Sequence, residues 1–185
     1  MPSAEIIAIG TELLLGEIQD TNTRHLARFL RDLGIDLYRA TLIGDNPNRI
    51  AQAIQEAFER SPIVITTGGL GPTVDDPTRQ AIAQAIGRPL EFRPDLWEQV
   101  QQRFLRFHRQ PTENNRRQAY IPQGAIPFEY PVRTAPAFFY HNPKNIIISL
   151  PGVPPEMEYL LEKALAPLTR QHFDLHSIIQ SITLH

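Results

Sequence analysis

Short runs of apolar, largely β-branched residues alternate with amphipathic helical patterns along most of this chain, and this alternation constrains the fold more than any other feature. Strands are expected at residues 5–9, 35–43, 62–67 and 145–150, and helices at residues 23–33, 50–58, 77–86 and 155–168. The run at 62–67 is apolar at successive positions, which is typical of a strand buried on both faces. The order therefore predicts an α/β protein with three α/β/α layers and a mostly parallel sheet.

Residues 88–144 interrupt this alternation. A helix is expected at 94–107 and a shorter one at 112–119, and prolines then punctuate what look like short edge strands. We interpret this stretch as an insertion, or a small α+β subdomain, on the core sheet.

Composition excludes several classes of protein. There is no cysteine, so disulfides, thiolate nucleophiles and cysteine metal sites are absent. Eighteen Lys and Arg residues against 20 Asp and Glu give a net charge of -2, which makes nucleic acid an improbable partner. Neither lysine follows a glycine loop and no G-x-S-x-G occurs, which excludes a P-loop NTPase and the usual α/β-hydrolase nucleophile turn. Because residues 1–10 lack a basic signal region and no apolar run reaches the length of a membrane span, we expect a cytoplasmic protein.

A glycine-rich loop at residues 66–78 gives the sharpest chemical signal. It joins a buried strand to the start of a helix, where glycines and exposed amides favour an anion such as phosphate, although a tight turn is the alternative. Asp76 precedes a proline and fits a helix N-cap. Two adjacent carboxylates, Asp75 and Asp76, would repel a bare phosphate, so a divalent metal ion between them and the ligand is expected.

Further polar residues follow other predicted strands. Thr11, Glu12 and Asn22 lie in the loop after the first strand, and Asp45 follows the second, as either a turn residue or an acceptor for a sugar hydroxyl. Because parallel strands end at one edge of a sheet, these loops and the loop at 151–156 should converge there. The segment T-E-N-N-R-R-Q-A (112–119) offers arginines for phosphate, or is simply a solvated helix start capped by Thr112.

Four ordered motifs resemble the N-terminal domain of the competence/damage-inducible (CinA) family, which is similar to molybdopterin-binding domains of the MogA/MoaB type. The motifs are I-G-T-E-L-L-L-G-E-I-Q-D-T-N (9–22), T-G-G-L-G-P-T-V-D-D (67–76), T-E-N-N-R-R-Q-A (112–119) and L-P-G-V-P-P-E-M (150–157). The resemblance implies one such domain over residues 1–170, with 171–185 as the start of a linker to a C-terminal domain that this chain lacks. It also implies metal-dependent hydrolysis of ADP-ribose to AMP and ribose 5-phosphate. The alternative is a non-catalytic domain that binds molybdopterin or a nucleotide, or only oligomerises.

The resemblance and the loop positions together give the expected site. Asp76 stands where the related molybdopterin domains have an essential aspartate. Asp76 and Asp75 are the expected catalytic residues, and with Glu12 the expected metal ligands. The expected ligand-binding residues are Gly10, Thr11, Glu12, Asn22, Asp45, Gly68, Gly69, Leu70, Gly71, Thr73, Asn115, Arg116, Pro151 and Gly152. Where the family usually reads P-V-G-T-A-P-G, this chain has Arg133 and Ala137 in place of two glycines, which puts close backbone approach there in question.

Members of the family are typically dimers or larger, and residues 88–144 are rich in Phe, Pro and Tyr. We therefore expect this stretch to contribute to a homodimer interface. Light scattering should give a mass above the 21.0 kDa of one chain. A single species of that mass across micromolar concentrations would contradict the expectation.

Overall fold

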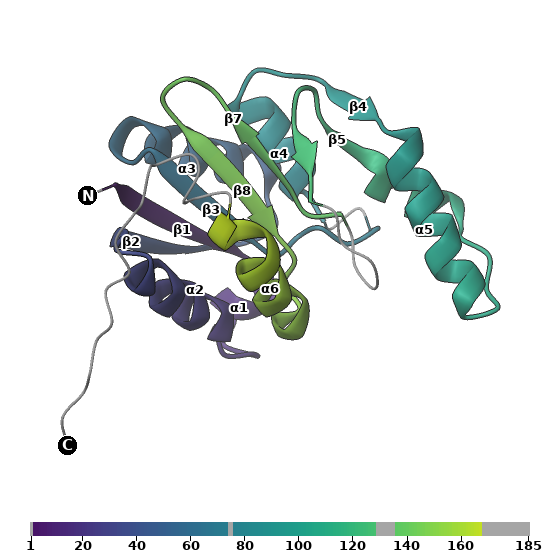
Figure 1. The fold of residues 1–185 in the computed structure, drawn as a ribbon, viewed down its shortest axis with the longest axis horizontal. Helices are drawn as coiled ribbons and strands as arrows, with labels where there is room; N and C mark the ends of the chain where they lie inside the picture. Colours follow the sequence, from purple (N-terminus) through teal and green to yellow (C-terminus); the bar gives the residue numbers. More distant parts are fainter. Residues whose placement is uncertain (1, 74–75, 129–135, 168–185) are drawn as a thin grey trace.

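A mixed, mostly parallel six-stranded sheet forms the centre of the computed structural model, which describes residues 2–73, 76–128 and 136–167 (Figure 1). Its strands, in spatial order, are β2 (Asp36–Ile43), β1 (Ser3–Ile9), β3 (Ile63–Thr67), β8 (Ile146–Leu150), β7 (Phe138–His141) and β6 (Ile126–Pro127). Neighbours from β2 to β8 pair in parallel, whereas β7 and β6 add antiparallel pairs at one edge. The predicted fold class is confirmed.

Helices cover both faces of the sheet. On one face, α2 (Thr21–Asp32) and α6 (Pro154–Leu160) bury Leu26, Leu30 and Met157, and α6 continues into the π-helix η2 (Leu161–Leu165). On the other face, α3 (Pro47–Arg60) and α4 (Thr78–Ala85) bury Ile54 and Ile82. No helix in the described ranges is long and apolar enough to cross a membrane.

The stretch at 88–144 divides between two places in the structure. Its first part forms a two-stranded antiparallel sheet from β4 (Leu90–Phe92) and β5 (Tyr120–Pro122), together with α5 (Pro94–Arg106) and the 3-10 helix η1 (Glu113–Ala119). These elements lie at one end of the molecule, with α5 extending away from the central sheet (Figure 1). Its later part supplies β6 and β7 to the main sheet, so it belongs to the core rather than to a separate unit.

Turn residues behave largely as the sequence predicts. Asn46 caps α3 by accepting a hydrogen bond from the Arg49 amide at 3.1 Å, and Gly34 and Gly87 end their helices with φ near +70°. The short α1 (Thr11–Leu14), directly after β1, was not expected. Its residues Glu12 and Leu13 line a cavity at the carboxyl edge of the sheet.

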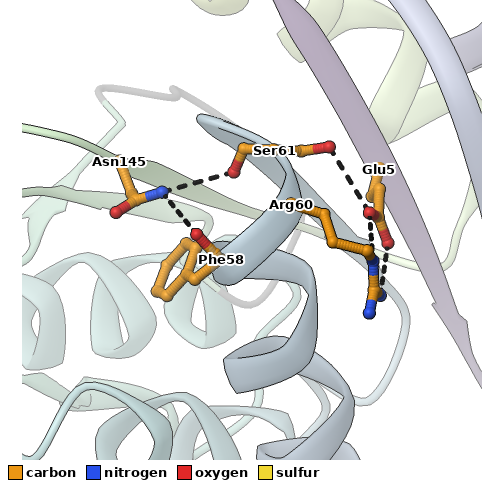
Figure 2. A network of polar contacts seen from close by, with 5 residues as sticks. All are labelled: Glu5, Phe58, Arg60, Ser61 and Asn145. Atoms are coloured by element: carbon orange, nitrogen blue, oxygen red, sulfur yellow. Dashed lines mark hydrogen bonds and ion pairs between the residues drawn. The ribbon is translucent and has the colours of Figure 1, made fainter.

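An ion pair between buried Glu5 and partly exposed Arg60 lies at the opposite, amino end of the sheet (Figure 2). Glu5 on β1 is only 3% exposed, and both of its carboxylate oxygens accept hydrogen bonds from Arg60, at 2.8 and 2.9 Å. Nearby, the Asn145 side-chain amide donates to the carbonyls of Phe58 and Ser61, which fixes the start of β8 against the end of α3. The Arg60 hydrogen bonds, opposed by burial, lower the pKa of Glu5.

Replacing Glu5 with glutamine is expected to lower the free energy of unfolding near neutral pH by about 1–3 kcal/mol, because charge-assisted hydrogen bonds are lost in a buried setting. A carboxyl whose pKa is lowered in the fold stabilises it above its unfolded pKa of about 4.3, and this stability is lost as the pH falls through the folded pKa. The difference between wild type and E5Q, measured by urea denaturation, should therefore shrink on acidification. Glu162→Gln, at an exposed position, is the control, and an equal effect of both variants would contradict this role.

Candidate active site

The loops that follow β1, β3 and β8 meet at the carboxyl edge of the sheet and enclose a cavity of about 480 Å³. Many of the predicted site residues line it: Glu12, Asn22, Gly68, Gly69, Leu70, Gly71, Asp76, Pro151 and Gly152. Three of the four loops expected to converge thus contribute directly. The cavity lies in the volume range of small-molecule sites.

Asn22, the second residue of α2, connects the end of β3 with the loop after β8 through hydrogen bonds in the floor of the cavity. Its side-chain amide donates to the Thr67 hydroxyl at 2.9 Å and to the Gly152 carbonyl at 2.8 Å, and the Thr67 hydroxyl donates to the Pro151 carbonyl at 3.1 Å. Asn22 is 8% exposed, and its Oδ1 atom is buried without a hydrogen-bond partner. An acceptor is therefore available next to the cavity for a donor group on a ligand.

The cavity floor requires glycine for two separate reasons, a positive φ at Gly68 and the close approach of two loops. Gly68 has φ +99°, and a Cβ there would lie 2.2 Å from the carbonyl oxygen of Ile9. Gly152 approaches it from the loop after β8, so that a Cβ on Gly152 would lie 3.3 Å from the Gly68 Cα atom. Main chain thus packs directly against main chain in the cavity floor.

Asp76 holds the glycine loop from one side. It accepts hydrogen bonds from the Gly71 amide at 2.8 Å, the Thr73 amide at 2.8 Å and the Thr73 hydroxyl at 2.6 Å. The prediction that Asp76 caps α4 is wrong, since Pro77 occupies the N-cap position. The carboxylate binds inside the loop because two loop amides point toward it, so these amides are already paired with the protein's own anion.

Arg79 holds the same loop from the other side, a role that the sequence analysis did not predict. Its guanidinium donates to the carbonyls of Leu70 and Gly71, and the residue is 4% exposed. Burial lowers the pKa of Arg79 to about 10, against the opposing charge of Asp76. An arginine at the second position of a helix usually predicts a solvated side chain, so only the packing of the loop reveals this role.

Acidic side chains outnumber basic ones around the cavity. Among the described residues that line it, Glu12, Asp20, Asp76 and Glu156 carry carboxylates and Arg103 carries the only guanidinium. Arg103 extends from α5 and donates to Gln118 of η1 at 3.1 Å. Burial lowers the pKa of Arg103, and the nearby charge of Glu156 opposes this. Sequence analysis missed Arg103 because its segment packs beside the cavity only in three dimensions.

Several predicted ligand-binding residues lie outside the lining and bond elsewhere. The Thr11 amide donates to Asp45 at 2.9 Å, and the Asp45 amide donates back to the Thr11 hydroxyl at 3.2 Å. This pair joins the loops after β1 and β2. The Gly10 Cα is covered by the Glu12 carboxylate, which a Cβ at Gly10 would meet at 2.6 Å. Thr73 is exposed and serves Asp76.

The segment at 112–119 contributes differently from the prediction. Thr112 is the N-cap of η1, as the alternative reading of the sequence predicts. Buried Asn115 completes a capping box by accepting hydrogen bonds from the Thr112 amide and hydroxyl, both at 2.8 Å. Arg116 lies 4.9 Å from the Phe92 ring and pairs with Glu113 at 3.6 Å. Gln118 is the member of this segment that reaches the cavity.

Two of the three predicted metal ligands can be placed in the described structure. Within the described parts of the chain, no group of three or more His, Asp or Glu side chains lies close enough to hold a metal ion. Glu12 and Asp76 both line the cavity, whereas Asp75, the third predicted ligand, lies outside the described residues. A protein cage built from these described side chains alone is therefore not present.

Comparisons with known proteins agree with this fold. The family model described as "Probable molybdopterin binding domain" matches residues 5–171. The crystal structure of CinA from Thermoplasma acidophilum, described as a protein with unknown function, aligns with a TM-score of 0.83 at 33% identity, over 90% of this chain and 98% of that one. The chain belongs to the CinA-like molybdopterin-binding domain family. MoaB from Thermus thermophilus, at 20% identity and a TM-score of 0.61, shares the fold.

Curated relatives of this CinA-like domain are longer than the chain. A CinA-like protein of Kosmotoga olearia is 48% identical over 164 residues, and one of Nostoc sp. is 45% identical over 183 residues. These alignments cover 89% and 98% of this chain, but 40% and 43% of the relatives. The chain thus spans less than half the length of these relatives.

One of the two departures from the usual family motif can be placed. Ala137 is 4% exposed and packs in the core between the sheet and helices α2 and α6, with its carbonyl accepting from the Phe128 amide at 2.9 Å. Ala137 is not among the described residues that line the cavity, so its methyl group does not occupy space in the cavity. Arg133 lies outside the described residues.

Replacing Asp76 with asparagine should destabilise this CinA-like domain by about 1–3 kcal/mol, because an amide group would face one of the loop donors that the carboxylate now accepts. Thr73→Val removes only the hydroxyl donor and should cost less, about 1 kcal/mol. Urea denaturation of both variants measures this. If D76N were as stable as the parent, the hydrogen bonds to the loop would contribute little to stability.

Proposed function

We propose that the cavity binds a nucleotide through its pyrophosphate and that this domain hydrolyses ADP-ribose to AMP and ribose 5-phosphate. The observation that carries the proposal is the 480 Å³ cavity, in which the glycine loop, carboxylates and one arginine meet at the carboxyl edge of parallel strands. Ligands of α/β proteins bind in this position. In the reaction, a water oxygen bonds to one phosphorus, the bond from that phosphorus to the bridging oxygen breaks, and two phosphomonoesters result.

The charge of the cavity supports a divalent cation as part of the bound ligand. Four carboxylates against one arginine leave an excess of three negative charges among the described lining residues. Repulsion between two unit charges about 4 Å apart is roughly 4 kcal/mol at an effective dielectric of about 20, so a bare pyrophosphate would bind poorly. Mg²⁺ commonly binds through one or two carboxylates plus substrate phosphates, which fits a donor set smaller than three.

Glu12 and Asp76 are the side chains that we propose to hold such an ion, with Asp75 as a third candidate. When bound, the ion neutralises phosphate charge and lowers the pKa of the attacking water. Glu12 is exposed and lines the cavity, so its side chain can reorient toward an ion at little cost. Asp76 is held in place by hydrogen bonds from the loop and also lines the cavity. Arg103 offers a positive charge to the phosphates from the opposite element, α5.

A non-catalytic domain that binds molybdopterin or a nucleotide is the second candidate. The observation that favours it is the pairing of both Asp76 oxygens within the loop, which gives this carboxylate a structural use without any reaction. The two candidates share the same cavity and differ in whether the ligand is turned over.

Incubation with ADP-ribose, with and without Mg²⁺ or Mn²⁺, distinguishes the two candidates. We expect AMP, detected by chromatography, only when the cation is present. Glu12→Gln should lower the rate at least about tenfold, equivalent to ~1.4 kcal/mol of lost interaction. Glu17→Gln, at an exposed position outside the cavity, is the matched control. If ADP-ribose and AMP bind but no cation yields turnover, the domain is a binding module.

The role of the Asp76 carboxylate is tested separately from its hold on the loop. D76N should lower turnover by roughly a hundredfold or more, as for loss of a group that acts on the reacting water. Thr73→Val weakens the same loop contact but keeps the carboxylate, so it should retain most activity. Equal losses in D76N and T73V would assign Asp76 a structural role only.

A further inference from the structure

A second, smaller cavity of about 220 Å³ lies between the start of α4 and the small β4–β5 sheet. Gly71 and Asp76 line both cavities, whereas Arg79, Arg117 and Tyr120 line the smaller one alone. The glycine loop therefore separates the two spaces. The function proposed above makes no use of the smaller one.

The charge of the smaller cavity is opposite to that of the larger. Its described lining carries two guanidiniums, from Arg79 and Arg117, against the single carboxylate of Asp76. A net positive charge in a small concave space favours an anion, whereas the larger cavity, with its excess of carboxylates, favours a cation. The two cavities are thus suited to different groups.

Arg79 supplies an independent indication of a ligand. The side chain is buried, and its Nε–H group has no hydrogen-bond partner, although its two other nitrogens donate to loop carbonyls. Neither of those carbonyls carries a full negative charge, and no carboxylate within the described residues forms an ion pair with it. Burying a charge is costly unless it is paired, so an anion near Arg79 would relieve this cost.

We propose that the smaller cavity is a binding subsite for a phosphate group, contacted by Arg79 and Arg117. Planar guanidinium groups donate paired hydrogen bonds to phosphate oxygens. The volume suits a phosphate or a small phosphomonoester rather than a whole dinucleotide. The Tyr120 ring, half-buried on β5, lies at the side of this space with its hydroxyl as a further donor. The subsite does not depend on hydrolysis and stands even if the domain has no catalytic activity.

Calorimetric titration of the full chain with inorganic phosphate tests the subsite. We expect saturable binding that weakens about tenfold in Arg117→Gln, since one charge-assisted contact is lost. Arg117 is exposed, so this variant should fold. Arg88→Gln removes an equally exposed arginine that lines neither cavity and should leave the affinity unchanged. The absence of saturable phosphate binding, or equal losses in both variants, would overturn the proposal.

A parallel titration with AMP identifies the source of the phosphate. If R117Q weakens AMP and inorganic phosphate alike, the subsite accepts either, and if it weakens inorganic phosphate alone, the free ion is its ligand. Arg79→Lys keeps the charge but loses the planar fork, and it should weaken phosphate binding while urea denaturation confirms that the variant is folded. A folded R79K with parental affinity for both phosphate and AMP would remove Arg79 from the subsite.

Discussion

The parallel pairing of β1, β3 and β8 is the constraint on which the rest of this structure depends. Strands aligned in one direction need a crossover between each pair, and these crossovers place helices on both faces and bury every residue of β3 and β8. The same alignment brings the carboxyl ends of the three strands to one edge. Residues as far apart in sequence as Asn22 and Gly152 thereby come within hydrogen-bonding distance.

The glycine loop is stable in this setting because charges of opposite sign hold its two polar faces. Asp76 accepts from its amides, and Arg79 donates to its carbonyls. Neither charge contacts the other as an ion pair, since loop backbone lies between them. A loop held in this way needs little reorganisation when a ligand arrives, which is the condition for effective electrostatic binding.

The sequence predicted the fold and the convergence of the loops that line the larger cavity, since both follow from local patterns. Apolar runs gave the strands, amphipathic spacing gave the helices, and the parallel order placed the loops together. It could not predict partners set by tertiary packing. Asp76 fits an N-cap by its position before a proline, but its carboxylate instead accepts hydrogen bonds from the Gly71 and Thr73 amides of the folded loop. Arg103 and Gln118 reach the cavity only because α5 and η1 pack together beside it, and no periodicity reports that contact.

Gly71 and Asp76 belong to the lining of both cavities, and this has a consequence for any two ligands that occupy them. A shared wall cannot move for one ligand without changing the surface that the other meets. If a group on one side alters the affinity on the other by some factor, linkage requires that the second group alter the affinity of the first by the same factor. The sign of that factor would depend on whether the loop position that favours one ligand also favours the other. This short loop, held by one carboxylate and one guanidinium, is thereby the element that would couple the binding free energies of two chemically different sites.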